Sequence, residues 1–237
     1  MTDSLDEREE VGGAVSAPSS AALMSQQKRG IRLTIFVLVA FIATVLLLFI
    51  NKITSPRILN SIELQVNGAH LFDKGRILTD FELQASDGSE FTLADFSGRW
   101  TLVFLGFTNC PDICPTTLAT LRDAYNKLRP EFREQVQVVL LTADPKRDTP
   151  EVLEPYIRYF HQDFTAVGGD FLTIKRLTGQ LNMTFVKVMQ GDSYTVDHSA
   201  NIALINPYGH YQGFIRPPFE SSRIQLAMQS IMAQWQD

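Results

Sequence analysis

The stretch "WTLVFLGFTNCPDICPTTLATLRDAYNKLR", residues 100–129, decides the fold of this chain. Its first eight letters form an apolar run that is typical of a strand buried on both faces. From residue 115 to residue 129, leucine and tyrosine side chains recur at helical spacing, which predicts a helix with one buried face. A buried strand that passes into a helix indicates an α/β domain, with Cys110 and Cys114 at the junction.

The pattern continues on both sides of this stretch. Residues 77–96 predict a hairpin whose turn is Asp87-Gly88. "VQVVLLTAD" ends a second buried strand at Asp144, and Asp148 with Glu151 three residues on resembles a capping box that starts a helix reaching residue 161. Further helices are expected at 172–181 and 219–236, and further strands at 185–191 and 201–209. We therefore expect a mixed sheet with helices on both faces, in a domain covering residues 76–237.

The N-terminal part has a different composition. Residues 1–30 are polar and acidic at the start, which predicts a disordered tail. Residues 33–50 carry no charge, and at about 1.5 Å per residue a helix of this length approaches the thickness of a bilayer core. We expect a transmembrane helix at 31–50 followed by a tether at 51–75. A cleaved signal peptide is the alternative, but the apolar run is too long and too far from the terminus.

The charges that flank this helix predict its orientation. Lys28, Arg29 and Arg32 precede the apolar run, whereas Lys52 and Arg57 follow it. The excess of positive charge on the N-terminal side favours a cytoplasmic N-terminus and a folded domain outside the cytoplasm. That compartment is oxidising, so free thiols there need a metal or a reducing partner.

Charge and cysteine content exclude two classes of protein. The net charge is −5, and no basic block interleaved with aromatic residues stands outside the membrane flank, so a nucleic-acid partner is not expected. The chain has only two cysteines, too few for a disulfide framework. Two inert buried cysteines would be the simplest alternative, but chance rarely places the only two in a chain four residues apart, each followed by proline.

Cys110 and Cys114 are better explained as a reactive pair. Residues four apart on a helical turn share a face, and the start of a helix favours thiolate, so we expect a lowered thiol pKa. Among the four histidines, His198 lies at the entrance of a predicted strand and is the candidate third ligand. Two thiolates with one imidazole suit copper or zinc, and these residues do not decide between the two metals. The same thiols could instead act as a redox couple that forms a reversible disulfide.

Four features resemble the Sco/SenC family of copper chaperones for cytochrome c oxidase. They are "GFTNCPDICPTTL", "TADPKRDTPEVL", "YTVDHSANIALINPYG" and the single N-terminal apolar helix, and the likeness covers about residues 76–235. The resemblance implies a thioredoxin-like fold. It also implies that copper, as Cu(I) or Cu(II), is held by Cys110, Cys114 and His198. Asp144 and Asp148 match the family's aspartates near the metal, although turn and helix-cap roles would explain both.

The resemblance implies a membrane-anchored chaperone that delivers copper to the dinuclear copper site of the oxidase. Its partners would be the copper-bearing oxidase subunit and another periplasmic copper chaperone or a thiol reductant. The acidic tail does not resemble a mitochondrial transit peptide, so we expect the bacterial inner membrane, with the C-terminal domain in the periplasm. A thiol–disulfide reductase that keeps the oxidase cysteines reduced is the main alternative, and a thiol peroxidase on the same scaffold is a weaker one.

Overall fold

Strand β4 (Trp100–Gly106) lies inside an eight-stranded sheet, and all seven of its residues are buried. The strand order is β1-β10-β9-β4-β5-β6-β2-β3. Strands β4, β5 and β6 run parallel, and the remaining pairs are antiparallel, so the sheet is mixed as expected. The other strands are β1 (Ala69–Arg76), β2 (Glu82–Ala85), β3 (Glu90–Thr92), β5 (Val136–Thr142), β6 (Thr165–Gly168), β9 (Ile202–Ile205) and β10 (Tyr211–Ile215).

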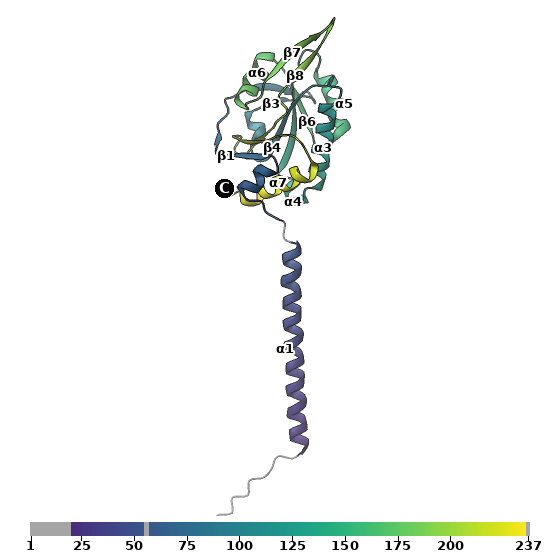
Figure 1. Ribbon diagram of the computed structural model, residues 1–237, viewed down its shortest axis with the longest axis vertical. Helices are drawn as coiled ribbons and strands as arrows, with labels where there is room; N and C mark the ends of the chain where they lie inside the picture. Colours follow the sequence, from purple (N-terminus) through teal and green to yellow (C-terminus); the bar gives the residue numbers. More distant parts are fainter. Residues whose placement is uncertain (1–19, 55–56, 236–237) are drawn as a thin grey trace, which may run out of the picture. The chain divides into compact units, whose positions relative to one another are not determined.

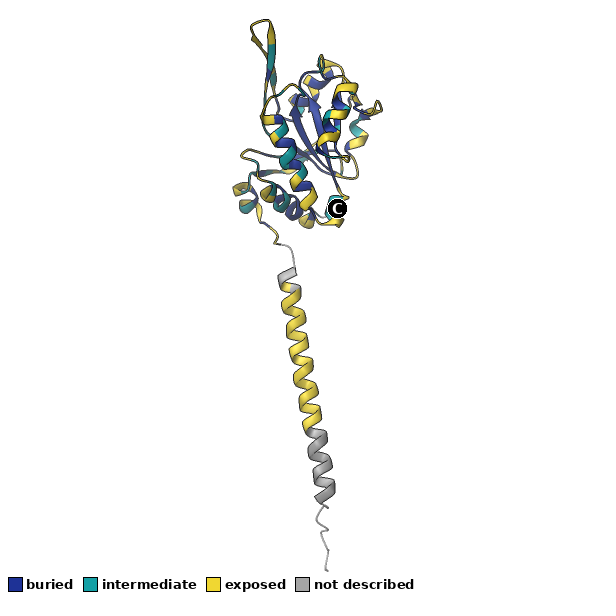
Figure 2. Cartoon of the chain, turned by 90° about the vertical axis from the view of Figure 1, so that its right-hand side faces the viewer, coloured by how far each residue is buried: buried dark blue, intermediate teal, exposed yellow. Residues whose placement is uncertain are grey.

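The helices follow the predicted positions closely and flank the sheet (Figure 1). Figure 2 shows the central strands buried and the outer surfaces of the surrounding helices exposed. Because β4 and β5 are parallel, a crossover must join them, and helix α3 supplies it. These helices are α3 (Ile113–Lys127), the short α4 (Pro130–Arg133), α5 (Pro150–Phe160), α6 (Phe171–Gln180) and α7 (Ser221–Gln234), with a 3-10 turn η1 (Leu93–Phe96).

The computed structural model describes residues 20–54 and 57–235 and divides the chain into two units, Met1–Pro56 and Arg57–Asp237. The described part of the first unit is helix α1 (Ser20–Thr54). Within it, Ile31–Ile50 is long and apolar enough to cross a membrane, and its side chains are exposed. Residues 20–30 were expected in a disordered tail but are helical, because helix-forming residues continue the helix beyond the apolar run. The rest of the expected tail, residues 1–19, lies outside the described residues.

The boundary expected at residue 76 is wrong. Helix α2 (Ser61–Val66) and strand β1 belong to the second unit, and Leu59, Leu64 and Ala69 are buried in its core. Strand β1 pairs with β10 at the edge of the sheet. The expected tether is therefore largely part of the domain, because its scattered apolar residues are buried only once α7 and β10 are in place.

The segment around His198 also differs from expectation. His198 was placed at the entrance of the strand now described as β9. It is instead the last residue of β8 (Ser193–His198), which pairs with β7 (Phe185–Gln190) in a separate two-stranded sheet. Phe185 lies opposite His198 in the register, at the base of this hairpin. A hairpin that projects from the main sheet therefore carries His198 (Figure 1).

Candidate metal centre

Cys110 and Cys114 lie between β4 and α3, as the sequence predicts. Helix α3 begins at Ile113, two residues earlier than expected, so Cys114 lies in its first turn and Cys110 in the preceding loop. The backbone N–H of Cys114 donates to the Sγ atom of Cys110 over 3.3 Å, so this turn directs both sulfurs to one side. Both cysteines are free; Cys114 is buried and Cys110 is partly exposed.

His198 completes the cluster from the other half of the domain. Its Nε2 atom lies 3.6 Å from the Sγ atom of Cys114. The three ligand atoms of Cys110, Cys114 and His198 all lie within 4.8 Å of one another. Metal–ligand bonds of about 2.0–2.3 Å place two ligand atoms on one ion about 3.5–4 Å apart, so this spacing suits a single ion. Two sulfurs and one imidazole nitrogen form a soft donor set that fits copper.

The surroundings of His198 orient its ring for ligation. Its Nδ1 atom lies 3.0 Å from the backbone carbonyl oxygen of Ser199, which can only accept a hydrogen bond. Nδ1 therefore carries the proton, and the lone pair of Nε2 faces the sulfur of Cys114. The rings of Phe104 and Phe107 pack edge-on against the imidazole, with centroids 6.1 and 5.9 Å away.

The expected lowering of the thiol pKa is wrong for Cys114. Burial raises the pKa of this thiol, and its hydrogen bond with Cys110 acts in the same direction. The desolvation of the charged form outweighs the field of the helix N-terminus because the sulfur is fully enclosed. Burial likewise raises the pKa of Tyr156, with the two cysteines adding to the effect. A metal ion at this centre would supply the positive charge that a Cys114 thiolate needs, so binding would release a proton.

Asp148 has a different role from the one its sequence context suggests. It does not cap α5, whose N-cap is Thr149 without a side-chain hydrogen bond. The Asp148 carboxylate is buried and accepts hydrogen bonds from the Thr108 hydroxyl (2.5 Å), the Thr108 N–H (3.2 Å) and the Thr142 hydroxyl (2.6 Å). It thus ties the loop that carries Cys110 to the end of β5. Neither Asp148 nor Asp144 joins the ligand cluster among the described residues.

Asp144 helps to hold the hairpin that carries His198. Its buried carboxylate accepts a hydrogen bond from the Tyr194 hydroxyl over 3.0 Å and another from Nε of Arg147. Arg147 also donates to the backbone carbonyl of Tyr194 over 3.2 Å and stacks on its ring at 3.9 Å. We call Tyr194, Asp144 and Arg147 the Tyr194 latch. It fixes β8 four residues before His198.

A second contact fixes the base of the same hairpin. The hydroxyl oxygen of Ser199 accepts the N–H of Thr184 over 2.9 Å, and the N–H of Ser199 donates to the carbonyl of Thr184 over 2.9 Å. His198 therefore lies between two residues that are held by hydrogen bonds, Tyr194 before it and Ser199 after it. Gly106, the last residue of β4, leaves room for the side chain of Cys114. A Cβ atom at this position would approach the Sγ atom of Cys114 to 3.2 Å.

The centre opens on one side to a small cavity of about 260 Å³. Its walls include Cys110, Ile113 and His198, whereas Cys114 lies behind them. Ile113 is exposed at the rim. Two of the three ligands are thus accessible to a partner, and the third is shielded from solvent.

Each site residue expected from the sequence is found in this cluster, and the other three histidines lie outside it. His70 stacks on Phe214, His161 packs against Tyr125 and Phe164, and His210 lies against Tyr208. Sequence analysis missed Tyr194, Thr108 and Gly106. All three lie inside the motifs "GFTNCPDICPTTL" and "YTVDHSANIALINPYG", but their roles depend on contacts made in the folded chain, which the motifs do not show.

Comparison with known proteins agrees with this geometry. The SCO1/SenC family model matches residues 70–233. A protein of Stutzerimonas stutzeri is 39% identical over 163 residues, which cover 68% of this chain and 80% of that protein. The crystal structure of Arabidopsis thaliana ScoI with copper bound has a TM-score of 0.61 and 29% identity, over 65% of this chain and 98% of that one. Yeast Sco1 with copper bound has a TM-score of 0.59 and 29% identity, over 67% of this chain and 88% of that one.

The residues matched by the family model include strands of the whole sheet and both halves of the metal centre. The solved structures supply the fold. The two copper-bound structures confirm the thioredoxin-like fold expected from the cysteine, DPKRDTP and VDHS motifs. The family model covers well over half of the chain, from β1 into α7. The chain belongs to the SCO1/SenC family.

Proposed function

We propose that this protein binds copper through Cys110, Cys114 and His198 and delivers it to the dinuclear copper site of cytochrome c oxidase during assembly. The observation that carries the proposal is the approach of three soft ligand atoms within 4.8 Å of one another. The copper-bound structures of two similar proteins support the choice of metal. Membership of the family supports the oxidase as the acceptor.

The environment of the ligands suits a carrier rather than a permanent metal site. Cys114 is enclosed, so it would retain copper and exclude water from one side. Cys110 and His198 line the open cavity, where the ligands of an acceptor could replace them one at a time. The imidazole adds a third ligand without adding charge. The three ligands could thus hold copper firmly and still release it to an acceptor through the cavity.

We further propose that α1 anchors the protein in the bacterial inner membrane, with a cytoplasmic N-terminus and the domain in the periplasm. The apolar segment Ile31–Ile50 supports an anchor by its length and composition. The positive charges concentrated before it support the orientation. Residues 1–30 would be the cytoplasmic part, and the domain from residue 57 onward would reach the oxidase subunit and a periplasmic copper donor or thiol reductant.

A thiol–disulfide reductase is the second candidate. The observation that favours it is the N–H···Sγ contact of 3.3 Å between the two free cysteines, which places them close together on one turn. Such a pair could transfer electrons to a disulfide of the oxidase subunit while forming its own disulfide. That reaction has no use for an imidazole ligand, so His198 separates the two candidates.

The decisive experiment measures copper binding by the full chain in nanodiscs. Wild-type protein is expected to bind one copper ion per chain, with thiolate-to-copper(II) charge-transfer bands that vanish in Cys110→Ser and Cys114→Ser. His198→Ala should weaken copper binding at least about 100-fold, the upper range for disturbing a ligand through its partners. It should leave the rate of thiol–disulfide exchange largely unchanged. His210→Ala, whose imidazole lies outside the cluster, is the matched control.

Two outcomes would contradict the proposal. Unchanged copper affinity in His198→Ala would refute the three-ligand site. Failure of the loaded protein to transfer copper to the purified, copper-free soluble domain of an oxidase copper subunit would refute delivery. Rapid reduction of that domain's disulfide without copper transfer would favour the reductase.

A further inference from the structure

A second and larger cavity lies next to the one at the metal centre, along the β7–β8 hairpin. Its volume is about 630 Å³, and it lies between β7, the start of α6 and the turn after β5. Val196 of β8 lines both this cavity and the smaller one at the metal centre. Strand β8 is therefore a wall common to the two cavities. We call the larger one the basic cavity, for the reason given next.

Three lysines from three different elements line the basic cavity. Lys146 follows β5, Lys175 belongs to α6 and Lys187 belongs to β7, and all three are exposed. None of them forms an ion pair within the described part of the chain. Their positive charges are thus unneutralised, although the chain as a whole carries a net charge of −5.

The two carboxylates that line the cavity are engaged elsewhere. Asp144 accepts hydrogen bonds from Tyr194 and Arg147 in the Tyr194 latch. Asp170 caps α6 by accepting the N–H of Thr173 over 2.9 Å. Neither is paired with a lysine of the cavity. The cavity therefore presents a positive surface with hydrogen-bond donors and without free carboxylate acceptors.

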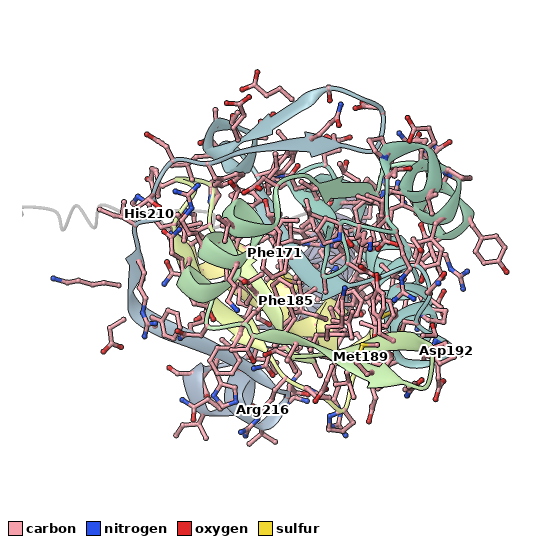
Figure 3. All side chains as sticks on the ribbon, turned by 90° about the horizontal axis from the view of Figure 1, so that it is seen from above. Phe171, Phe185, Met189, Asp192, His210 and Arg216 are labelled. Atoms are coloured by element: carbon pink, nitrogen blue, oxygen red, sulfur yellow. The ribbon has the colours of Figure 1, made fainter. Side chains whose placement is uncertain are left out.

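The cavity also has an apolar floor. Phe171 at the start of α6 and Phe185 at the start of β7 pack edge to face, with ring centroids 5.6 Å apart (Figure 3). Phe171 is 48% exposed and Val186 is 59% exposed. Exposed apolar side chains continue along the neighbouring helix and hairpin at Leu172, Val188 and Met189. An apolar patch rimmed by charge is typical of a protein-binding surface.

We propose that the basic cavity docks an acidic segment of a protein partner, with carboxylates on the lysines and an apolar side chain on Phe171 and Phe185. Charge complementarity selects this occupant, since none of the three lysines is paired with a carboxylate in the described part of the chain. The apolar floor distinguishes it from a site for a free anion. The identification of this partner as the copper acceptor rests on the proposed function. Because Val196 lines both cavities and lies two residues before His198 on β8, a docked segment would hold the acceptor next to the two accessible ligands, Cys110 and His198.

The test uses a probe that does not depend on the oxidase. The probe is a fluorescein-labelled peptide in which glutamates alternate with phenylalanines, and its partner peptide has glutamine at each glutamate. Full-length protein in nanodiscs of zwitterionic lipid is titrated with each peptide while fluorescence anisotropy is recorded. Wild-type protein is expected to bind the glutamate peptide and to lose most of that affinity in high salt. The glutamine peptide should bind at least about tenfold more weakly.

Two double variants locate the binding. Lys146→Glu with Lys175→Glu should weaken peptide binding at least about tenfold while copper loading stays at the wild-type level. Lys74→Glu with Lys127→Glu makes the same charge change on exposed lysines outside the cavity and should bind the peptide as wild-type protein does. Lys187 is left in place in both variants, because it also stacks on Tyr194 at 3.7 Å.

The outcomes separate this inference from the proposed function. If the wild-type protein does not bind the glutamate peptide, or if the Lys146/Lys175 variant binds it equally well, the docking site is refuted. An equal loss in both double variants would also refute it, because the effect would then reflect net charge alone. If the peptide binds as expected but copper is not transferred to the oxidase domain, docking stands and the proposed delivery fails.

Discussion

At the scale of single residues, Asp148 shows how one carboxylate can organise the candidate metal centre without belonging to its cluster of ligand atoms. It accepts hydrogen bonds from Thr108 and Thr142, which belong to the loop before Cys110 and to the end of β5. The sequence suggested a helix cap, because Asp148 stands three positions before Glu151 and Pro150 fits the first turn of a helix. In the structure, Asp148 instead joins the loop after β4 to the end of β5.

Removal of this carboxylate tests its positioning role. Asp148→Ala leaves the Thr108 N–H and two hydroxyl groups without their acceptor, which should lower the free energy of unfolding by about 1–3 kcal/mol. The Cys110 loop should also become more variable, so copper affinity should fall and the charge-transfer bands should shift. Denaturant unfolding and copper titration measure the two effects. Asp123→Ala, an exposed aspartate on α3, is the control and should change neither.

We expect His70 to make the stability of the domain depend on pH. Burial lowers its pKa, and the charge of Arg216 lowers it further. Its Nε2 atom is buried without a hydrogen-bond partner, and its ring stacks on Phe214. The folded state therefore takes up the proton less readily than the unfolded state, whose histidine pKa is about 6.5.

The sign of the pH effect follows from proton linkage. Well above pH 6.5 neither state is protonated at His70. Below a pH of about 6.5 the unfolded state binds the proton first, so the stability falls as the pH decreases toward the folded-state pKa. Denaturant unfolding of wild-type protein and His70→Gln over the weakly acidic range checks this. The variant should lose less stability on acidification, and an identical slope in the two proteins would show that His70 does not contribute.

At the scale of elements, the β7–β8 hairpin decides where the third ligand lies. It forms its own two-stranded sheet, so the backbone ladder of the main sheet does not hold it. The Tyr194 latch and the Thr184–Ser199 contact hold it instead. Lys187 and Arg147 both stack on the Tyr194 ring. The hairpin position thus depends on a few side chains, and so does the distance between His198 and the cysteines.

Tyr194→Phe removes one hydrogen bond from the latch and retains the stacked ring. We expect the free energy of unfolding to fall by about 0.5–1.5 kcal/mol. Copper affinity should fall several-fold, because His198 is then held less firmly, and the rate of copper release should rise. Stopped-flow release to a chelator measures this. Tyr159→Phe, at an 82% exposed tyrosine, serves as control. Equal release rates in all three proteins would contradict a positioning role for Tyr194.

At the scale of the whole molecule, the folded domain begins near Arg57, well before the first of the sequence motifs that carry the proposed ligands. The N–H of Leu59 donates to the Ser230 hydroxyl of α7 over 2.9 Å, and its carbonyl accepts from Gln234 over 2.8 Å. Leu59 and Leu64 are buried, and β1 covers the edge of β10. Residues 57–76 therefore close one end of the core, although they carry none of the proposed ligands.

Two truncated versions test this boundary. A version that begins at Arg57 should fold and melt cooperatively. A version that begins at Ile77 loses two buried leucines, each contributing about 1.5–3 kcal/mol, and leaves an edge of β10 unpaired. We expect it to be insoluble or to melt without a cooperative transition. Circular dichroism during thermal unfolding compares the two, and similar melting temperatures would place the boundary at residue 76 after all.

Much of the domain and all three proposed ligands could be predicted from the sequence by itself. Apolar runs and helical spacing report local structure directly, so the strand before Cys110, the helices and the hairpin at Asp87-Gly88 were expected and are present. The cysteine pair was evident because its two members lie within one helical turn. The position of His198 before a predicted strand made it the candidate third ligand, and the family motifs supported that choice and implied the thioredoxin-like fold.

Only the tertiary structure decided the features that join distant residues. His198 follows Cys114 by 84 residues, and their contact exists because β8 folds back over the start of α3. The raised pKa of Cys114, the bridging role of Asp148 and the inclusion of residues 57–76 in the core depend on burial. Burial is a property of the assembled core. Local spacing therefore determined which residues could form the centre, and packing determined how they are held.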